Sequence, residues 1–418
     1  MNNNTKTNGF FSWICTALIW LVFMYSSIIQ QYIKISNAML ILGVGIMLFY
    51  FLSYTNEPFS IQSEVTIECR RFIPFMIYML LVGIVFSPAL SRHMSQWITS
   101  IEYMLIMIVI ASKINRTGTE SFQLMLLMES IVLAIVFFLN PVKHNNGRYA
   151  LSMEMNPNGL GMSFCTGIWA TLYYQSKKKV PLSLSFFLVG VFTYCIILSG
   201  SRKSIIAAGI IFILWFLFVF FPSTKEKRWG WGFVYLLFAA VIIIYIGNYL
   251  LDSYSNSTLY ARMENLQYES TEGSRNMMYR IGWNMFKARP LFGYGFQGYS
   301  YYNGAYSHST LVEIPVSGGI IGSILYFYTY FISIRKLIYL FRWSSNREDL
   351  REEKIQIKML LILWMAYLFF CTCIIHIYQF GSFIVFGLIF GQTNYLERKV
   401  TGTSESSDVK VSGCKYIK

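Results

Sequence analysis

Apolar stretches of about twenty residues recur along the whole chain, and short polar segments separate most of them. Each stretch is long enough to cross a hydrocarbon core of about 30 Å as a helix. The pattern predicts an all-α polytopic membrane protein with about 12 transmembrane helices. The expected spans are residues 11–29, 35–54, 72–90, 97–112, 121–140, 158–175, 181–199, 203–221, 230–251, 309–334, 356–376 and 380–396. Among these, 97–112 is short and carries Glu102.

One connection between the expected spans is much longer than the others. It predicts four parts: an N-terminal transmembrane bundle at 1–251, a large extracytoplasmic loop at 252–308 between the ninth and tenth spans, C-terminal transmembrane helices at 309–396, and a cytoplasmic tail at 397–418. Long loops in membrane-anchored domains usually carry function. Apolar residues between Met277 and Phe286 have the spacing of an amphipathic helix that lies at the membrane surface.

Composition and charge agree with a membrane protein. The chain is 55% hydrophobic and 13% charged, whereas about a quarter of the residues of a soluble domain are charged. Most of the 34 Lys and Arg residues fall in alternate connections and in the tail, which predicts that both termini lie in the cytoplasm. The net charge of +14 therefore reflects topology and does not indicate nucleic-acid binding. The seven cysteines have neither disulfide nor zinc-site spacing.

Several cations fall on the opposite, external side of this topology. They are Arg148, Arg202, Lys203, Arg275 and Arg280. A charge at membrane depth is costly and is kept mainly where it serves a cavity or a partner. The guanidinium group matches phosphate oxygens, so the set suggests a lipid-linked phosphate or pyrophosphate. The alternative for each arginine is that it extends to ordinary phospholipid, and for any single one the two interpretations are equally open.

Other candidates lie in or just after the long loop. His308 could take a proton from a sugar hydroxyl, because histidine titrates near neutral pH. On local sequence alone the favoured alternative is a polar residue at a helix start, capped by Ser307 or Ser309. Glu313 is expected to be buried and to contact a cation from the loop. Tyr294 and its neighbouring tyrosines could stack on sugar rings or form an interfacial belt.

The sequence predicts no metal and no cofactor. Asp occurs only at Asp252, Asp349 and Asp408, and the first external loop holds no acidic residue. A hard cation such as magnesium prefers carboxylate oxygens. No P-loop, zinc motif or dinucleotide-binding turn is present in the sequence.

Four stretches, in order along the chain, carry a resemblance to a known family. They are Arg148 with Asn156-Pro157-Asn158, then Leu198-Ser199-Gly200-Ser201-Arg202, then Gly273-Ser274-Arg275 leading to Pro290-Leu291-Phe292-Gly293-Tyr294-Gly295, and finally His308-Ser309 with Gly319 and Gly322. Together they resemble the superfamily of O-antigen ligases and Wzy-type polysaccharide polymerases, which are membrane glycosyltransferases of GT-C-like architecture.

The resemblance implies a metal-independent enzyme of the bacterial cytoplasmic membrane, with its active site on the extracytoplasmic face. Its donor and acceptor would be undecaprenyl-pyrophosphate-linked oligosaccharides, polymerised into a capsular, O-antigen or exopolysaccharide chain. A chain-length regulator and a flippase of the same pathway are the partners that this implies. Arg202 and Arg275, with Arg148, would bind the pyrophosphate, and His308 would be the base or positioning group for the acceptor hydroxyl.

Within the resemblance, the loop arginine is open. The family has an aromatic residue four positions after it, which here is Tyr279, although Trp283 follows one turn later. Arg275 is therefore favoured over Arg280. The expected substrate-binding set is completed by Arg280, Lys203, Tyr294 and Glu313.

Two other functions compete with polymerisation. A ligase would transfer finished polymer to a lipid or wall acceptor, using the same donor and fold. A transporter or lipid-linked oligosaccharide flippase would show internal repeats and polar residues at mid-membrane. The polar residues of this chain collect at the external face, which argues against transport.

Overall fold

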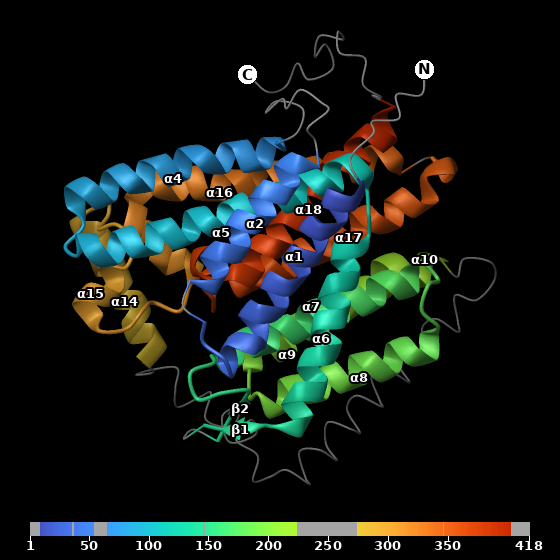
Figure 1. Cartoon of the computed structure of the whole chain (residues 1–418), viewed down its shortest axis with the longest axis horizontal. Helices are drawn as coiled ribbons and strands as arrows, with labels where there is room; N and C mark the ends of the chain where they lie inside the picture. The colour runs from blue at the N-terminus through green and yellow to red at the C-terminus, as the bar shows by residue number, and fades with distance from the viewer. Residues whose placement is uncertain are drawn as a thin grey trace.

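The computed structural model describes residues 9–35, 37–53, 65–144, 147–223, 274–345 and 347–402, and most of them are helical (Figure 1). The helices before residue 224 are α1 (Gly9–Ser27), α2 (Ala38–Leu52), α4 (Ile67–Phe86), α5 (Leu90–Thr117), α6 (Ser121–Leu139), α7 (Pro157–Ser176), α8 (Leu182–Leu198), α9 (Arg202–Trp215) and α10 (Phe221–Ser223). The later helices are α14 (Ser274–Ala288), α15 (Gly298–Asn303), α16 (Thr310–Ser344), α17 (Arg351–Phe370) and α18 (Phe380–Thr401).

The remaining elements are short. Strands β1 (Val142–Lys143) and β2 (Tyr149–Ala150) form an antiparallel pair in which Val142 faces Ala150. Single-turn helices are η1 (Ile29–Gln31), η3 (Glu348–Leu350) and η4 (His376–Tyr378), and η2 (Phe216–Phe220) is a π-helical turn that continues α9.

A helix overlaps each expected span that lies in the described residues, so the all-α class of the membrane protein is confirmed. Six are long and apolar enough to cross a membrane: Gly9–Gln31, Ile67–Phe86, Leu90–Thr117, Ser121–Leu139, Arg202–Phe220 and Thr310–Ser344. The expected span 97–112 belongs to one of them, because the helix around it is 28 residues long. The expected span 230–251 lies outside the described residues. The total of about 12 crossings stays a prediction.

The central helices pack closely because glycines face their neighbours. α18 lies against α5, and a Cβ atom on Gly391 would stand 2.6 Å from the carbonyl oxygen of Ala111. A Cβ on Gly387 would stand 2.9 Å from the carbonyl oxygen of Met107. Small residues of this kind let helix backbones approach one another inside a membrane, where no hydrophobic force drives the helices together.

The expected loop 252–308 is partly helical in the described residues, and residues 252–273 lie outside them. α14 covers the predicted amphipathic segment, and α14 and α15 lie together at one end of the bundle, on the left of Figure 1. The segment between them runs against a break in α16 at Gly319, where φ is 62° and ψ is −159°.

Backbone hydrogen bonds join this segment to the broken helix. Tyr294 N–H donates to the carbonyl of Val316 at 2.9 Å, and Ile320 N–H donates to the carbonyl of Pro290 at 2.8 Å. Polar backbone groups freed by a helix break must find partners in an apolar surrounding. The segment 290–295 supplies these partners, so the break and the glycine-rich turn depend on each other.

A histidine of α5 holds the same turn from the other side. His93 Nδ1 accepts a hydrogen bond from Phe296 N–H at 2.8 Å, and the two rings stack with centroids 5.5 Å apart. Gly83 of α4 makes room for this ring, because a Cβ there would lie 1.9 Å from His93 Nε2. Helices α4 and α5 therefore anchor the segment 290–296 that precedes α16.

We predict that Gly293→Ala destabilises the protein much more than Gly304→Ala. Both glycines have positive φ, 71° and 70°, and this conformation costs other residues about 1–2 kcal/mol. A Cβ on Gly293 would also stand 2.5 Å from the carbonyl oxygen of Val316, whereas one on Gly304 meets nothing within 4 Å. Thermal unfolding in detergent should show a loss of about 3 kcal/mol or more for Gly293→Ala. Equal losses in the two variants would contradict the close approach.

Candidate functional site

Helices α9, α14 and α16 meet at the connection between α17 and α18, residues 371–379. Its carbonyl groups accept side-chain hydrogen bonds from all three helices and from the residue that precedes α16. The bonds are Ser309 Oγ to Cys371 O at 3.0 Å, Lys203 Nζ to Thr372 O at 2.5 Å, Tyr279 Oη to Thr372 O at 2.8 Å and Thr310 Oγ1 to Ile374 O at 2.6 Å. Backbone carbonyls outside regular helix must find partners within the protein when they lie in an apolar bundle. The connection 371–379 therefore gathers elements that are far apart in sequence.

The cationic start of α9 lies at this connection. Lys203 Nζ donates to both the carbonyl and, at 3.3 Å, the hydroxyl oxygen of Thr372. Arg202 is the first residue of α9 and is half-buried. Because the N-terminus of a helix carries a partial positive charge, the two side chains add to a region that is already positive.

Arg148 joins two of the sequence motifs into one unit. It is buried, with 6% of its surface exposed, and its Nε donates to the carbonyl of Ser199 at 2.9 Å. Its Nη2 donates to Asn158 Oδ1 at 2.8 Å, and Ser201 Oγ donates to that same oxygen at 3.1 Å. The turn at Gly200 has a positive φ of 61°, and a Cβ there would stand 3.0 Å from Arg148 Cγ. The starts of α7 and α9 are thereby held together.

His308 sits in a turn that is fixed on both sides. Its φ is 55°, a left-handed conformation that is uncommon for residues other than glycine. Ser307 is buried and its Oγ donates to Glu313 Oε2 at 2.7 Å, while Ser309 is tied to Cys371 as described above. The ring of His308 lies 4.3 Å from the ring of Tyr306. Such strain persists where the surroundings determine the conformation, and it is typical of functional sites.

The alternative interpretation of this turn, a polar residue at a helix start, agrees with its position, because Ser309 occupies the N-cap position of α16. The hydroxyl of Ser309 makes no cap hydrogen bond, however, and instead donates to the carbonyl of Cys371.

Glu313 lies fully buried in the first turn of α16. Besides Ser307, it accepts a hydrogen bond from Tyr378 Oη at 3.0 Å. Burial, together with the neighbouring Glu313 carboxylate, raises the pKa of Tyr378, so its phenol stays protonated and donates. Within the described residues the partners of Glu313 are thus hydroxyl and amide groups. Its expected contact with a loop cation stays a prediction. Gln297 N–H also donates to Tyr378 Oη, at 3.2 Å.

The loop cations differ in position. Arg275 lies in the first turn of α14, and its side chain is outside the described part of the structure. Tyr279, one turn later, reaches the carbonyl of Thr372. Arg280 is exposed. Tyr294 is buried beside Arg289, whose guanidinium carbon stands 4.6 Å from the centre of its ring.

Sequence reasoning missed Thr372 and Tyr378. The predicted span 356–376 included Thr372, and Tyr378 fell between two predicted spans. In the structure α17 ends at Phe370, so the helix does not extend across the connection. The available signal was the cluster of polar residues Thr372, His376 and Gln379 inside an otherwise apolar stretch. Within the described residues, no group of three His, Cys, Asp or Glu side chains could hold a metal ion.

Comparison with known proteins adds one family. Residues 184–327 match the family model described as O-antigen ligase. The match runs from α8 into α16 and includes Arg202, Arg275, His308 and Glu313, while Arg148 and the connection 371–379 lie outside it. No curated protein matches the chain.

We predict that Arg148→Lys lowers the free energy of unfolding by about 1–3 kcal/mol, because an ammonium group cannot reach both oxygens that the guanidinium bonds. Arg335→Lys on the exposed side of α16 is the matched control and should change stability by less than about 0.5 kcal/mol. Thermal unfolding of the purified protein in detergent measures both. An Arg148→Lys variant as stable as the control would contradict the buried network.

Proposed function

We propose that the chain is a glycosyltransferase that polymerises lipid-linked oligosaccharides. The proposal starts from its membrane-spanning helices and from the match of residues 184–327 to the O-antigen ligase family model. Its substrates would be undecaprenyl-pyrophosphate-linked repeat units, and its product a surface polysaccharide. It would lie in the bacterial cytoplasmic membrane with both termini inside and the site outside. The observation that carries the proposal is the convergence of Arg148, Lys203 and the His308 turn on one end of the bundle.

The positive character of this end suits a pyrophosphate. α7, α9 and α16 all begin here, linked through the bond from Ser201 to Asn158 and through the connection 371–379. Helix N-termini attract phosphate groups, and Arg202 and Lys203 stand at one of them. In a surrounding of low dielectric constant these charges act strongly on a developing negative charge.

The chemistry needs few protein groups, because pyrophosphate is a good leaving group. The acceptor hydroxyl oxygen would attack the anomeric carbon of the donor sugar and pass its proton to His308. The bond from the anomeric carbon to the pyrophosphate oxygen would break, and the electron pair would leave with the pyrophosphate. Arg202, Arg275 and Arg148 would stabilise that charge, and no step of the proposal uses a metal ion.

Helical spacing supports Arg275 as the loop arginine. It lies four residues before Tyr279, which is one turn of α14, and Tyr279 contacts the connection 371–379. Arg280 lies about 100° around the helix from Tyr279 and is exposed. We therefore assign the pyrophosphate to Arg275.

A ligase remains the second candidate, because the matched family is described as O-antigen ligase. The decisive experiment incubates purified protein with lipid-linked repeat units, with and without EDTA, and separates the products on a gel. A ladder of longer lipid-linked glycans supports a polymerase. Transfer of polymer to a different acceptor, without a ladder, supports a ligase. Loss of activity in EDTA that magnesium restores would overturn the metal-free proposal.

We predict that Arg202→Ala and Arg275→Ala each lower the rate of glycan transfer about 100-fold or more, since each would remove a charge that stabilises the leaving pyrophosphate. Arg280→Ala is the matched control on the same helix and should keep most of the activity. The initial rate of ladder formation by detergent-purified variants measures the effect. If Arg280→Ala lost activity while Arg275→Ala kept it, the assignment of Arg275 would be wrong.

We also predict a graded effect at the histidine turn. His308→Ala should lower kcat about 100-fold or more while leaving the KM for the lipid-linked donor within about threefold. Ser307→Ala should lower kcat less, because Ser309 still holds the turn on its other side. Ser323→Ala, whose hydroxyl bonds only within α16, is the control. A Ser307→Ala variant that changed KM alone would speak against a positioning role.

A further inference from the structure

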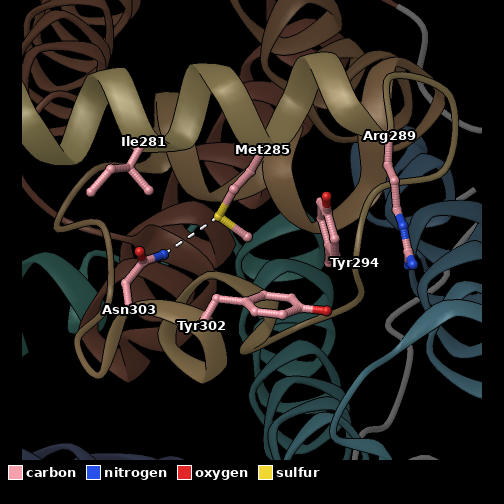
Figure 2. A pocket seen from close by; sticks show the side chains of 6 residues that line it. All are labelled: Ile281, Met285, Arg289, Tyr294, Tyr302 and Asn303. Atoms are coloured by element: carbon pink, nitrogen blue, oxygen red, sulfur yellow. Dashed lines mark hydrogen bonds between the residues drawn. The ribbon is translucent and has the colours of Figure 1, made fainter.

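A second concave surface lies on the far half of α14, apart from the connection 371–379. It is a pocket of about 390 Å³ between α14, α15 and the glycine-rich turn, lined by Ile281, Met285, Arg289, Tyr294, Tyr302 and Asn303 (Figure 2). Figure 2 shows the side chain of Met285 and the ring of Tyr302 facing each other across it. Its volume is within the range of small-ligand sites.

The walls of this pocket combine aromatic faces with polar ends. The rings of Tyr294 and Tyr302 meet edge to face with centroids 5.6 Å apart. Within the described residues, neither phenol oxygen has a hydrogen-bond partner, and Tyr302 is 54% exposed. The amide nitrogen of Asn303 donates to Met285 Sδ and to the carbonyl of Tyr299, and its amide oxygen accepts no hydrogen bond from the described residues.

The charged residue of the pocket, Arg289, already has partners within the protein. Arg289 lies over the ring of Tyr294, and its Nη1 donates to the carbonyl of Phe86 at 3.0 Å. No carboxylate lines the pocket. Apolar ring faces beside neutral hydroxyl and amide groups match a sugar ring, which has C–H faces and a rim of hydroxyl groups.

α14 relates this pocket to the proposed reaction centre. Ile281, Met285 and Arg289 follow one another at intervals of four residues and share one side of the helix. Met285 lies six residues beyond Tyr279, about 9 Å along the helix axis from the residue that contacts Thr372. Six residues also rotate the position by about 120° around the helix, so a glycan whose pyrophosphate lay at the start of α14 would reach the pocket by bending around α14.

We propose that this pocket binds a sugar ring of the oligosaccharide at a distance from the reacting anomeric carbon. The inference rests on the proposed function and adds a subsite that selects the repeat unit. Tyr302 is the stacking platform, and Asn303 and Tyr294 recognise hydroxyl groups. The alternative is an aromatic patch that contacts only lipid. In that case the residues of the pocket would contribute no more to glycan binding than neighbouring tyrosines do.

The test uses oligosaccharides of one to three repeat units without lipid carrier, prepared by partial hydrolysis of the host's own surface polysaccharide. Their binding to the detergent-purified full-length protein is measured by saturation-transfer NMR. Tyr302→Ala should weaken binding about tenfold, which corresponds to about 1.4 kcal/mol. Tyr301→Ala is the matched control, because Tyr301 is its neighbour in α15 with 47% exposure and does not line the pocket.

The outcomes separate the two proposals. Arg202→Ala should keep the binding of carrier-free glycan and lose transfer, because the pocket does not hold the pyrophosphate. Equal binding by the Tyr301→Ala and Tyr302→Ala variants would overturn the pocket, even if the wild-type protein made a full ladder. A wild-type protein that binds glycan at the pocket but forms no glycosidic bond would instead overturn the proposed function.

Discussion

The end of α17 imposes the constraint on which the candidate site depends. A helix leaves its last carbonyl groups without partners, and an apolar bundle offers no water to satisfy them. In this chain the N–H groups of residues 371–374 pair with the last carbonyls of α17, and the carbonyls of Cys371 and Thr372 after the helix end remain for the other helices. Lys203, Tyr279 and Ser309 each donate a hydrogen bond to one of these two carbonyls. The connection that follows a single helix end thus fixes the relative positions of α9, α14 and the turn before α16.

A second requirement of the same kind holds the segment from Pro290 to Gly295. The break in α16 at Gly319 frees backbone groups, and this segment forms hydrogen bonds with them. Glycine is needed where the two backbones touch, since a Cβ on Gly319 would stand 2.3 Å from the carbonyl oxygen of Leu291. His93 then links this unit to the first helices through Phe296. The polar groups of the site are therefore rigidly supported although they lie at a bundle end.

How far the sequence predicts this architecture depends on the range of each interaction. The helices could be predicted, because hydrophobicity over twenty residues is a local property. The grouping of Arg148 with the 198–202 turn was expected only through a family resemblance, and the hydrogen bonds to Asn158 and Ser199 give it a geometric basis. The polar residues Thr372, His376 and Gln379 mark this connection in the sequence, but the contacts to Thr372 could not be predicted, because Tyr279 and the shorter bond of Lys203 use its backbone carbonyl, which every residue type possesses. The same holds for the break at Gly319, since any glycine could lie in a continuous helix.

The extent of the family match has a physical consequence for the proposed mechanism. Residues 184–327 contain Arg202, Arg275 and His308, yet the elements that carry them are also bonded to residues outside that segment. The start of α9 is fixed by Arg148 from before it and by Thr372 from beyond it. Stabilising a leaving pyrophosphate requires charges that are already oriented before the substrate arrives. The transmembrane helices outside the matched segment are therefore part of the site, because they supply the orientation of the charges.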